Sequence, residues 1–470
     1  MRVAVVGGGL AGLAAAYRLR RALGPDVEIT VIELSARLGG KLRTVELAGH
    51  PYDVGAEAFL ARRPEIPALL GELGMSGELV HPTAATAGIR AGGRTRAIPA
   101  GTVLGVPVSA AAVADVLSEN GLRRVAGEAD LPPLQLDRDV SVGELLTTRL
   151  GPEVSDRLVD PLLGGVYAGR AGNLGLRATM PALAAKLDAG AGSVLAAAAG
   201  LVQPSNGTRT PVFGTVTGGL GTLTDRLASA SGAVIRHGLP VHALHRTDFG
   251  WQLDLGSVPR PEFLDADAVI LAVPAPAARR LLADIAPAAS SAYGRIDLAS
   301  MAVVALALPP DAAVPDSSGV LLASGERHAD GIPFTAKGFT FSSRKWAHVG
   351  GPGHLLIRGS VGRFGEAEVL QREDADLIAA VRADLAELTG VTAEPMDAIL
   401  TRWGGGLPQY GVGHLDLVDT IERSVADIPG LAVAGAALHG VGLPGCVAGA
   451  DMAAQRVADH LRTMRPGVRQ

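Results

Sequence analysis

The sequence predicts an α/β fold, because strand-like and helix-like segments alternate along most of its 470 residues. Residues 3–19 and 430–461 each contain a short apolar run, a glycine-rich loop and an alanine-rich helical stretch. Continuous apolar runs of this kind are typical of buried parallel strands. Residues 103–205 have mainly helical patterns, and Ser141 followed by Glu144 is a capping box at a helix start. We therefore expect a parallel α/β domain interleaved with a mixed-sheet domain and a helical insertion.

The first glycine-rich loop has the spacing of a dinucleotide-binding turn. Gly7, Gly9 and Gly12 form G-x-G-x-x-G between an apolar run and a helical stretch. Glycine lets the backbone approach a pyrophosphate, and the N-terminus of the next helix directs free N–H groups at that anion. The first 60 residues are thus predicted to begin a Rossmann-like domain.

An acidic residue and a second loop extend this pattern. Glu33 ends the next strand-like run, 21 residues after Gly12, where a carboxylate can accept hydrogen bonds from both ribose hydroxyls. A 2′-phosphate would be repelled there, which argues against NADP. Arg37, Gly39 and Gly40 complete E-x-x-x-R-x-G-G, which resembles the extended signature of FAD enzymes. We expect this second loop to approach the pyrophosphate from its other side.

Composition narrows the class of protein. Apolar residues make up 48% and charged residues 19% of the chain, as in folded globular proteins of two or three domains. A net charge of −5 gives no support for nucleic-acid binding, and we expect at most peripheral contact with membranes. The single cysteine, Cys446, forms no disulfide within the chain, which fits a cytoplasmic location.

Seven motifs spread over nearly the whole chain point to one family. They are GGGLAGLAAAYRL, ELSARLGGKLRT, DVGAEAFL, DPLLGGVYAGRAGNLGLRATMP, AVILAVPA, RWGGGLPQYGVGHL and AGAALHGVGLPGCVAGA. The chain resembles the oxygen-dependent porphyrinogen oxidases of haem synthesis, the bacterial coproporphyrinogen III oxidase and protoporphyrinogen oxidase branch of the FAD amine oxidase superfamily. GGVYAG at 164–169 and W-x-x-x-x-P-Q-Y-x-x-G-H at 403–414 are the more specific motifs.

The resemblance implies a reaction. It implies FAD-dependent oxidation of coproporphyrinogen III to coproporphyrin III in three two-electron rounds, with molecular oxygen as acceptor and hydrogen peroxide as product. The flavin carries the hydride chemistry, so no catalytic side chain is singled out. No metal is expected, since His242 and His245 have no third ligand nearby in the sequence. The expected partners are the porphyrinogen and oxygen, and contact with the next enzyme of the haem pathway is left open.

Other functions remain open at this point. Protoporphyrinogen IX differs from coproporphyrinogen III only by two vinyl groups in place of two propionates. The sequence does not show how many cationic residues of the substrate pocket pair with propionates. An amine oxidase or a carotenoid desaturase of the same superfamily is a further alternative, as is a flavin-bound sensor without turnover. The soluble, bacterial-type pattern favours coproporphyrinogen III.

The motifs and the resemblance together give a set of expected site residues. FAD is expected to be held without a covalent bond by Gly7, Gly8, Gly9, Leu10, Ala11, Gly12, Leu13, Glu33, Leu34, Arg37, Gly39, Gly40, Lys41, Gly55, Ala56, Glu57, Ala58, Val241, Trp403, Val441, Gly442 and Leu443. Lys41 stands where many superfamily members have arginine. The C-terminal helix, from near Gly445, is expected to direct its positive end at the flavin N1–C2=O atoms.

The expected substrate residues are Arg96, Gly165, Tyr167 and Gly169. Gly164, Gly165 and Gly169 are expected to present backbone to the flat face or pyrrole edge of the macrocycle. Core packing is an equal alternative for Tyr167, and a solvated charge is the slightly favoured alternative for Arg96. Trp403 has plain core packing as its alternative role.

The expected domains are discontinuous. The FAD-binding domain comprises residues 1–60, 206–285 and 401–470. The substrate domain comprises residues 61–102 and 286–400, and the helical insertion comprises residues 103–205.

Overall fold

The apolar runs at both ends of the chain meet in one parallel sheet. The computed structural model describes residues 1–202, 211–257, 259–351 and 353–464. The five strands lie in the order β12 (Val234–Arg236), β2 (Glu28–Ile32), β1 (Arg2–Val6), β16 (Ala268–Leu271) and β22 (Leu431–Val433). All four pairings are parallel, which confirms the predicted buried strand at the centre of the sheet.

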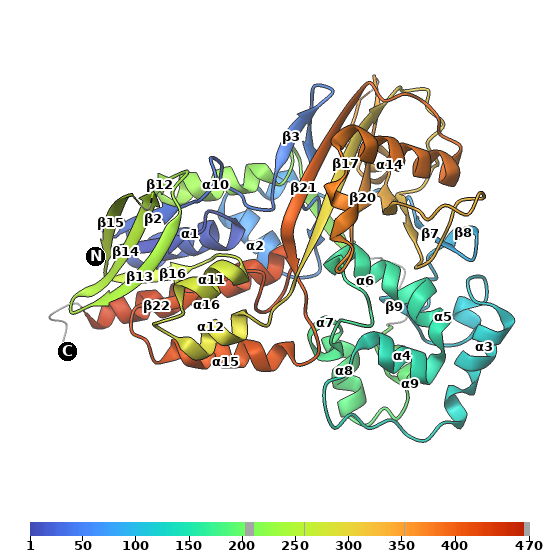
Figure 1. Ribbon diagram of the computed structural model, residues 1–470, viewed down its shortest axis with the longest axis horizontal. Coiled ribbons are helices and arrows are strands. Elements are labelled where there is room, and N and C mark those ends of the chain that lie inside the picture. Colours follow the sequence, from blue (N-terminus) through green and yellow to red (C-terminus); the bar gives the residue numbers. More distant parts are fainter. Residues whose placement is uncertain (203–210, 258, 352, 465–470) are drawn as a thin grey trace.

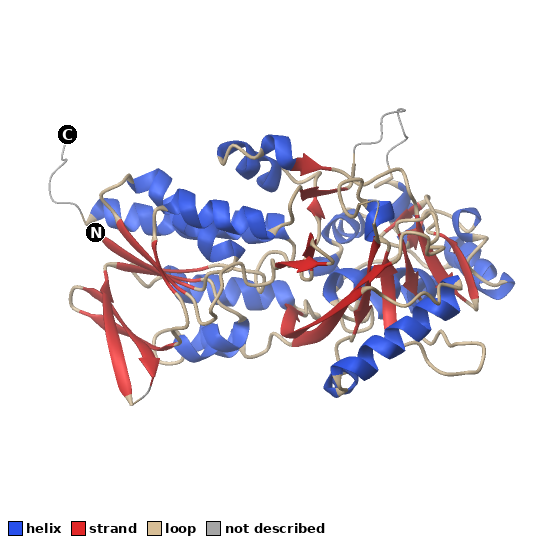
Figure 2. Cartoon of the chain, turned by 90° about the horizontal axis from the view of Figure 1, so that it is seen from above, coloured by secondary structure: helices blue, strands red, loops and turns tan. Residues whose placement is uncertain are grey.

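Helices cover both faces of this sheet (Figures 1 and 2). Val3 and Val5 of β1 face one core cluster, whereas Ala4 and Val6 face another, as the two-residue period of a strand requires. The first cluster contains α1 (Leu10–Leu23), α2 (Glu65–Glu72), α10 (Gly221–Ser231) and α16 (Leu443–Thr463). The second contains α11 (Ala275–Leu281), α12 (Pro287–Tyr293), α15 (His414–Ala426) and the antiparallel strands β13 (Val241–Thr247), β14 (Gly250–Ser257) and β15 (Arg260–Ala266).

A seven-stranded mixed sheet forms the centre of the second lobe. Its order is β21 (Asp397–Pro408), β17 (Leu298–Leu308), β20 (Leu355–Val361), β19 (Ala336–Thr340), β18 (Gly319–Leu322), β7 (Ala87–Ala91) and β8 (Arg94–Ala97). Only the β18–β7 pairing is parallel among these described strands. The long helix α14 (Asp374–Thr389) packs on one face through apolar side chains.

A helical layer lies below the mixed sheet in Figure 1. Its helices are α3 (Glu119–Ala126), α4 (Val142–Leu150), α5 (Pro152–Val154), α6 (Asp160–Tyr167), α7 (Leu176–Thr179), α8 (Pro181–Asp188) and α9 (Val194–Ala199). The Ser141 hydroxyl accepts a 3.0 Å hydrogen bond from the Glu144 N–H, as predicted for the start of α4. These features confirm the α/β fold with a helical insertion.

Further short strands lie outside these two sheets. They are β3 (Thr44–Leu47), β4 (His50–Asp53), β5 (Phe59–Leu60), β6 (Leu79–Val80), β9 (Thr102–Val103), β10 (Val106–Pro107) and β11 (Phe213–Val216). Leu47 and Val54 pack against Ala305 and Leu356 of the mixed sheet. The segment after β4 therefore lies where the two lobes meet.

The expected domain limits need adjustment at two places. The limit between 400 and 401 falls inside β21, which belongs wholly to the mixed sheet. The limit between 285 and 286 separates α12 from the parallel sheet, although Ala289 and Ala292 of α12 pack in its core. Both shifts arise because tertiary packing, not local pattern, decides to which lobe an element belongs. The limit between 205 and 206 lies outside the described residues.

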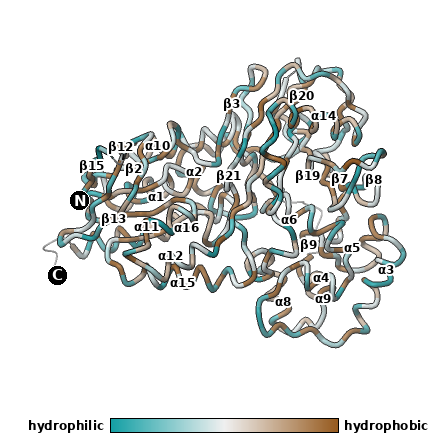
Figure 3. Tube along the Cα trace, in the orientation of Figure 1, coloured by the Kyte–Doolittle hydropathy of each residue, from teal (hydrophilic) through white to brown (hydrophobic). Residues whose placement is uncertain are grey.

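Hydrophobic residues are distributed through both lobes (Figure 3). Within the described ranges, none of the helices combines the length and apolar character needed to cross a membrane.

Candidate functional site

The first glycine turn is closely packed on one side and open on the other. Gly7 has a φ of 108°, in the region that favours glycine. A Cβ atom at Gly12 would overlap the Gly7 carbonyl oxygen, so helix α1 packs directly on the turn. At Gly9 the nearest atom to such a Cβ is the Gly40 Cα at 3.9 Å. The open side of Gly9 is therefore where an anion can reach the backbone.

Two helix N-termini have no capping side chain. α1 begins after Gly9 and α16 begins after Gly442, and neither helix has an acidic residue in its first turn. Since the first N–H groups of a helix have no partner within it and carry partial positive charge, both ends favour anionic groups. α16 begins at Leu443, two residues before the predicted start.

Glu33 follows β2 and is held in place by backbone donors. Its carboxylate accepts hydrogen bonds from the Gly8 N–H at 2.7 Å and the Ser35 N–H at 2.8 Å. Each carboxylate oxygen has a further lone pair, so the group remains able to accept hydroxyl donors. Leu34, the next residue, is 68% exposed.

Glu33→Ala is expected to raise the dissociation constant for FAD by about tenfold or more, because charge-assisted hydrogen bonds are worth about 1.5–3 kcal/mol each. Fluorescence titration of the apoprotein with FAD measures the change. Glu28→Ala, at the exposed start of the same strand, is the matched control and should bind FAD like the unaltered protein. An unchanged affinity in Glu33→Ala would remove this residue from the cofactor site.

The second loop is hydrogen-bonded to the first. The Gly39 N–H donates to the Gly8 carbonyl oxygen at 2.8 Å. The Arg37 guanidinium donates to the carbonyl oxygens of Leu38 at 3.1 Å and Gly40 at 2.9 Å. The Arg37 side chain thus stabilises its own loop. Burial lowers the pKa of Lys41, which follows this loop.

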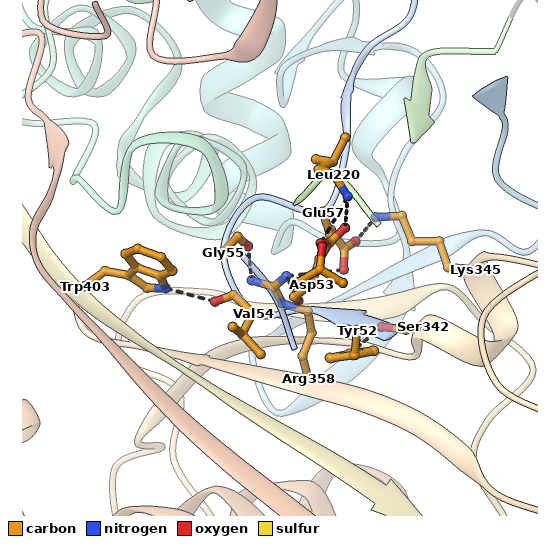
Figure 4. A network of polar contacts seen from close by, with 11 residues as sticks. Tyr52, Asp53, Val54, Gly55, Glu57, Leu220, Ser342, Lys345, Arg358 and Trp403 are labelled. Atoms are coloured by element: carbon orange, nitrogen blue, oxygen red, sulfur yellow. Dashed lines mark hydrogen bonds and ion pairs between the residues drawn. The ribbon is translucent and has the colours of Figure 1, made fainter. Parts of the chain in front are cut away.

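The segment from Val54 to Ala58 packs against Trp403 of β21. The Trp403 indole N–H donates to the Val54 carbonyl oxygen at 2.9 Å (Figure 4). A Cβ at Gly55 would overlap the Lys41 carbonyl oxygen and lie 3.1 Å from the Trp403 ring. The close approach of these three segments explains the glycine at position 55. The Ala56 N–H donates to the Lys41 carbonyl oxygen at 3.1 Å. Four expected cofactor residues therefore lie together: Lys41, Gly55, Ala56 and Trp403.

An ion-pair network that the sequence analysis missed surrounds this segment (Figure 4). Glu57 pairs with Lys345 and with Arg358, whose guanidinium lies 3.5 Å from the carboxylate. Arg358 also donates to the Gly55 carbonyl oxygen at 3.0 Å. Burial acts to raise the pKa of Glu57, but the two cations outweigh it and lower the pKa below its ordinary value. A basic residue inside the apolar run of β20 was the available sequence signal.

Asp53 connects the same segment to α10. Its carboxylate accepts a 2.6 Å hydrogen bond from the Thr44 hydroxyl and a 3.0 Å hydrogen bond from the Leu220 N–H, at the start of that helix. Burial raises the pKa of Asp53 to about 6. The sequence analysis included Asp53 only as the first residue of the DVGAEAFL motif and predicted no role for its side chain.

The remaining expected cofactor residues lie at the ends of the parallel sheet or beside it. Val241 is 7% exposed at the start of β13. Val441 packs against the helical layer, and Gly442 and Leu443 form the start of α16. Burial raises the pKa of Cys446, in the first turn of α16, to about 11, so its thiol stays protonated at neutral pH.

The GGVYAG motif forms the end of α6 and the turn after it. A Cβ at Gly164 would overlap the Arg363 guanidinium, and one at Gly169 would overlap the Gln409 side chain, whereas Gly165 has only the Leu321 Cδ2 at 4.0 Å. Gly164 and Gly169 are buried and Gly165 is exposed, so Gly165 is the one of these three expected glycines with an open side. Ala168, with φ of 48°, makes the left-handed turn.

Two expected substrate residues have surroundings of different kinds: Tyr167 is buried, and Arg96 is exposed at the edge of the mixed sheet. Tyr167 is 8% exposed, its ring centroid is 5.6 Å from that of Tyr410, and burial raises its pKa to about 12. Arg96 is exposed on the edge strand β8, and within the described ranges its guanidinium donates only to the Thr95 carbonyl oxygen. Both positions fit the alternatives of core packing and a solvated charge better than substrate contact.

The described residues contain no group of three or more His, Cys, Asp or Glu side chains that could hold a metal ion. The parallel sheet, the two uncapped helix ends and the acid after β2 define a dinucleotide-binding protein. The model of the flavin containing amine oxidoreductase family matches residues 10–460. The chain belongs to this family and is an FAD-dependent oxidoreductase.

Individual relatives agree with this assignment. Coproporphyrinogen III oxidase of Mycobacterium leprae (strain TN) is 44% identical over 457 residues, 96% of each chain. The Bacillus subtilis (strain 168) protein of the same name is 30% identical, covering 98% of this chain and 97% of its own. The crystal structure of a candidate protoporphyrinogen oxidase from Exiguobacterium sp. 255-15 has a TM-score of 0.84 and 32% identity, with 98% and 99% covered.

A more distant structure shares the fold alone. Cyclohexylamine oxidase from Brevibacterium oxydans IH-35A matches with a TM-score of 0.70 at 16% identity, covering 98% of this chain and 99% of its own. The residues of the present chain fit the cofactor: an open backbone at Gly9, an oriented carboxylate at Glu33 and a free helix N-terminus after Gly442. These groups suit the pyrophosphate, the ribose and the flavin ring.

Proposed function

We propose that this protein oxidises coproporphyrinogen III to coproporphyrin III with molecular oxygen, releasing hydrogen peroxide, in haem biosynthesis. The observation that carries the proposal is the 44% identity to the Mycobacterium leprae coproporphyrinogen III oxidase over 96% of both chains. Each of three rounds removes two electrons and two protons from the substrate and reduces one oxygen molecule to hydrogen peroxide. Bound FAD supplies the hydride-accepting group.

The residues of the chain hold and orient the reactants. Glu33 and the turn at Gly9 fit the ribose and the pyrophosphate, and the free N–H groups of α16 favour negative charge on the flavin ring. A non-covalent cofactor is part of the proposal, supported by the half-buried, protonated thiol of Cys446. A cytoplasmic location and oxygen as the acceptor are likewise proposed.

Aerobic turnover of both porphyrinogens, followed by porphyrin fluorescence, tests the proposal. We expect coproporphyrin III to form with one hydrogen peroxide for each two electrons removed. Protoporphyrinogen IX is the second candidate substrate, favoured by the similarity to the Exiguobacterium structure. Turnover of protoporphyrinogen IX alone would select that second candidate, and turnover of neither would refute both.

Gly165→Leu is expected to lower porphyrinogen turnover at least about tenfold, because a side chain on the exposed side of α6 would obstruct a flat substrate that needs an approach of about 3–3.5 Å. FAD content and thermal midpoint should be unchanged, since a Cβ there meets only one atom within 4 Å. Gly172→Leu, three residues after the GGVYAG motif, is the control: a Cβ there would meet nothing within 4 Å, and turnover should stay normal. Normal turnover in a folded Gly165→Leu protein would place the substrate elsewhere.

A further inference from the structure

Lys337 is a mostly buried lysine that has no hydrogen-bond partner among the described residues. It lies on β19, between β18 and β20 of the mixed sheet, and is 8% exposed. Among the residues that the structure describes, its ammonium is influenced by neighbouring charges but has no hydrogen bond. The Lys337 nitrogen is not among the fully enclosed polar atoms that lack a partner, so a group from outside the chain can reach it. An anionic group there would offset the cost of a partly enclosed, unpaired charge.

A β-bulge sets the direction of Lys337. Ala336 pairs with Val361 and Gly338 pairs with Ser360, which leaves Lys337 as the extra residue. Bulges re-aim side chains and are frequent beside active sites. Ala336 itself packs in the core beneath α14, whereas the charges that influence Lys337 most are those of Arg363 and Arg358.

These two arginines place Lys337 between the segment from Val54 to Ala58 and α6. Arg358 donates to the Gly55 carbonyl oxygen at 3.0 Å, and Arg363 lies 3.4 Å from the Asp160 carboxylate at the start of α6. Leu321 lies beside both elements: its Cδ2 would be 3.1 Å from a Cβ at Gly338 and 4.0 Å from one at Gly165. Lys337 is therefore close to the exposed side of α6.

Positive charge exceeds negative charge around Lys337. The surrounding carboxylates already have cations: Glu57 with Arg358 and Lys345, Asp160 with Arg363, and Glu366 with Arg170. Burial, followed by the two guanidiniums, lowers the pKa of Lys337 to about 7. A carboxylate bound beside the ammonium would favour its charged form.

We propose that Lys337 binds a carboxylate of the substrate and thereby favours a tetrapyrrole with four carboxylates over one with two. This inference rests on the proposed function, because it requires a porphyrinogen in front of α6. A protonated Lys337 would donate to the carboxylate, while Arg358 and Arg363 add to the attraction from either side. Lys337 would then be a residue that determines specificity.

The test compares Lys337→Met with the unaltered holoenzyme in binding and in turnover. Coproporphyrin III and protoporphyrin IX serve as binding probes, and the corresponding porphyrinogens serve as substrates. We expect Lys337→Met to weaken coproporphyrin III binding by about tenfold or more, as for a lost hydrogen bond between charged groups. Protoporphyrin IX binding should change less, and FAD content should not fall.

Two further variants complete the test. Lys337→Arg should recover most of the affinity, and Lys186→Met, on the exposed face of α8, should match the unaltered enzyme. Equal weakening for both porphyrins, or a lower kcat with unchanged KM, would overturn the carboxylate-binding role. If the unaltered enzyme oxidises neither porphyrinogen, the proposed function itself fails, whereas normal turnover with an unaffected Lys337→Met refutes only the inference about Lys337.

Discussion

Gly12→Val is expected to destabilise the fold by about 3 kcal/mol or more and to give protein without bound flavin. The first valine carbon would overlap the Gly7 carbonyl oxygen, and Gly7 is fixed by a 2.8 Å hydrogen bond from its N–H to the Ile32 carbonyl oxygen. Overpacking costs about 1–3 kcal/mol where side chains can adjust, and here the obstacle is backbone. The thermal midpoint and the ratio of flavin to protein measure the two effects.

Gly9→Val separates cofactor binding from folding in the same turn. A Cβ at Gly9 would lie 3.9 Å from its nearest neighbour, and the backbone there is extended, with φ of −76°. The apoprotein should therefore unfold at nearly the same temperature as the unaltered apoprotein. Its affinity for FAD should still fall at least about tenfold, because valine occupies the approach of the pyrophosphate to the backbone. Unchanged affinity would show that the pyrophosphate does not lie at Gly9.

Glu57→Gln is expected to lower the free energy of unfolding of the apoprotein by about 1.5–3 kcal/mol, the usual worth of a hydrogen bond between charged groups, because the Glu57 carboxylate is only partly buried beside its two cations. Glutamine keeps the shape of the side chain but leaves Lys345 and Arg358 without a carboxylate. Urea unfolding of the apoprotein, followed by tryptophan fluorescence, measures this loss. Glu394→Gln, at an 80% exposed side chain paired with Arg382, is the control and should cost about 1 kcal/mol or less.

The loss in Glu57→Gln should depend on pH in a defined direction. The folded protein holds the pKa of Glu57 below the ordinary value of 4.5. The charge of Glu57 therefore stabilises the fold at pH values above 4.5, and this contribution disappears as the pH falls through the lower folded value. The difference in stability between the two proteins should narrow over that acidic range. If the difference in stability between the two proteins stays constant down to acid denaturation, the charge of Glu57 is not its cause.

The sequence was most informative where function depends on local backbone geometry. The turn at Gly7, the acid at Glu33 and the helix after Gly442 each lie within a strand–loop–helix unit, so their positions follow from spacing alone. The parallel sheet could be predicted for the same reason. The family resemblance added Trp403, whose contact with Val54 joins residues 349 positions apart.

Features that depend on distant side chains could not be predicted in this way. Arg358, Lys345 and Glu57 come from three separate segments, and only the packing of the lobes brings them together. The openness of Gly165 and the burial of Gly169 likewise depend on Leu321 and Gln409, which are remote in sequence. Charged residues inside apolar strands are the sequence signal that such networks leave.

The parallel sheet is built from strands that lie far apart in the sequence, and this affects how the protein folds during synthesis. β1 and β2 leave the ribosome well before β22, which completes the sheet, and before α16, which covers α1. Pairings between such distant segments have high contact order and form slowly. The apolar surface of β1 and α1 therefore stays exposed until residues 431–463 have been synthesised and can pack against it. Chaperone demand and aggregation during expression should be greatest in that interval.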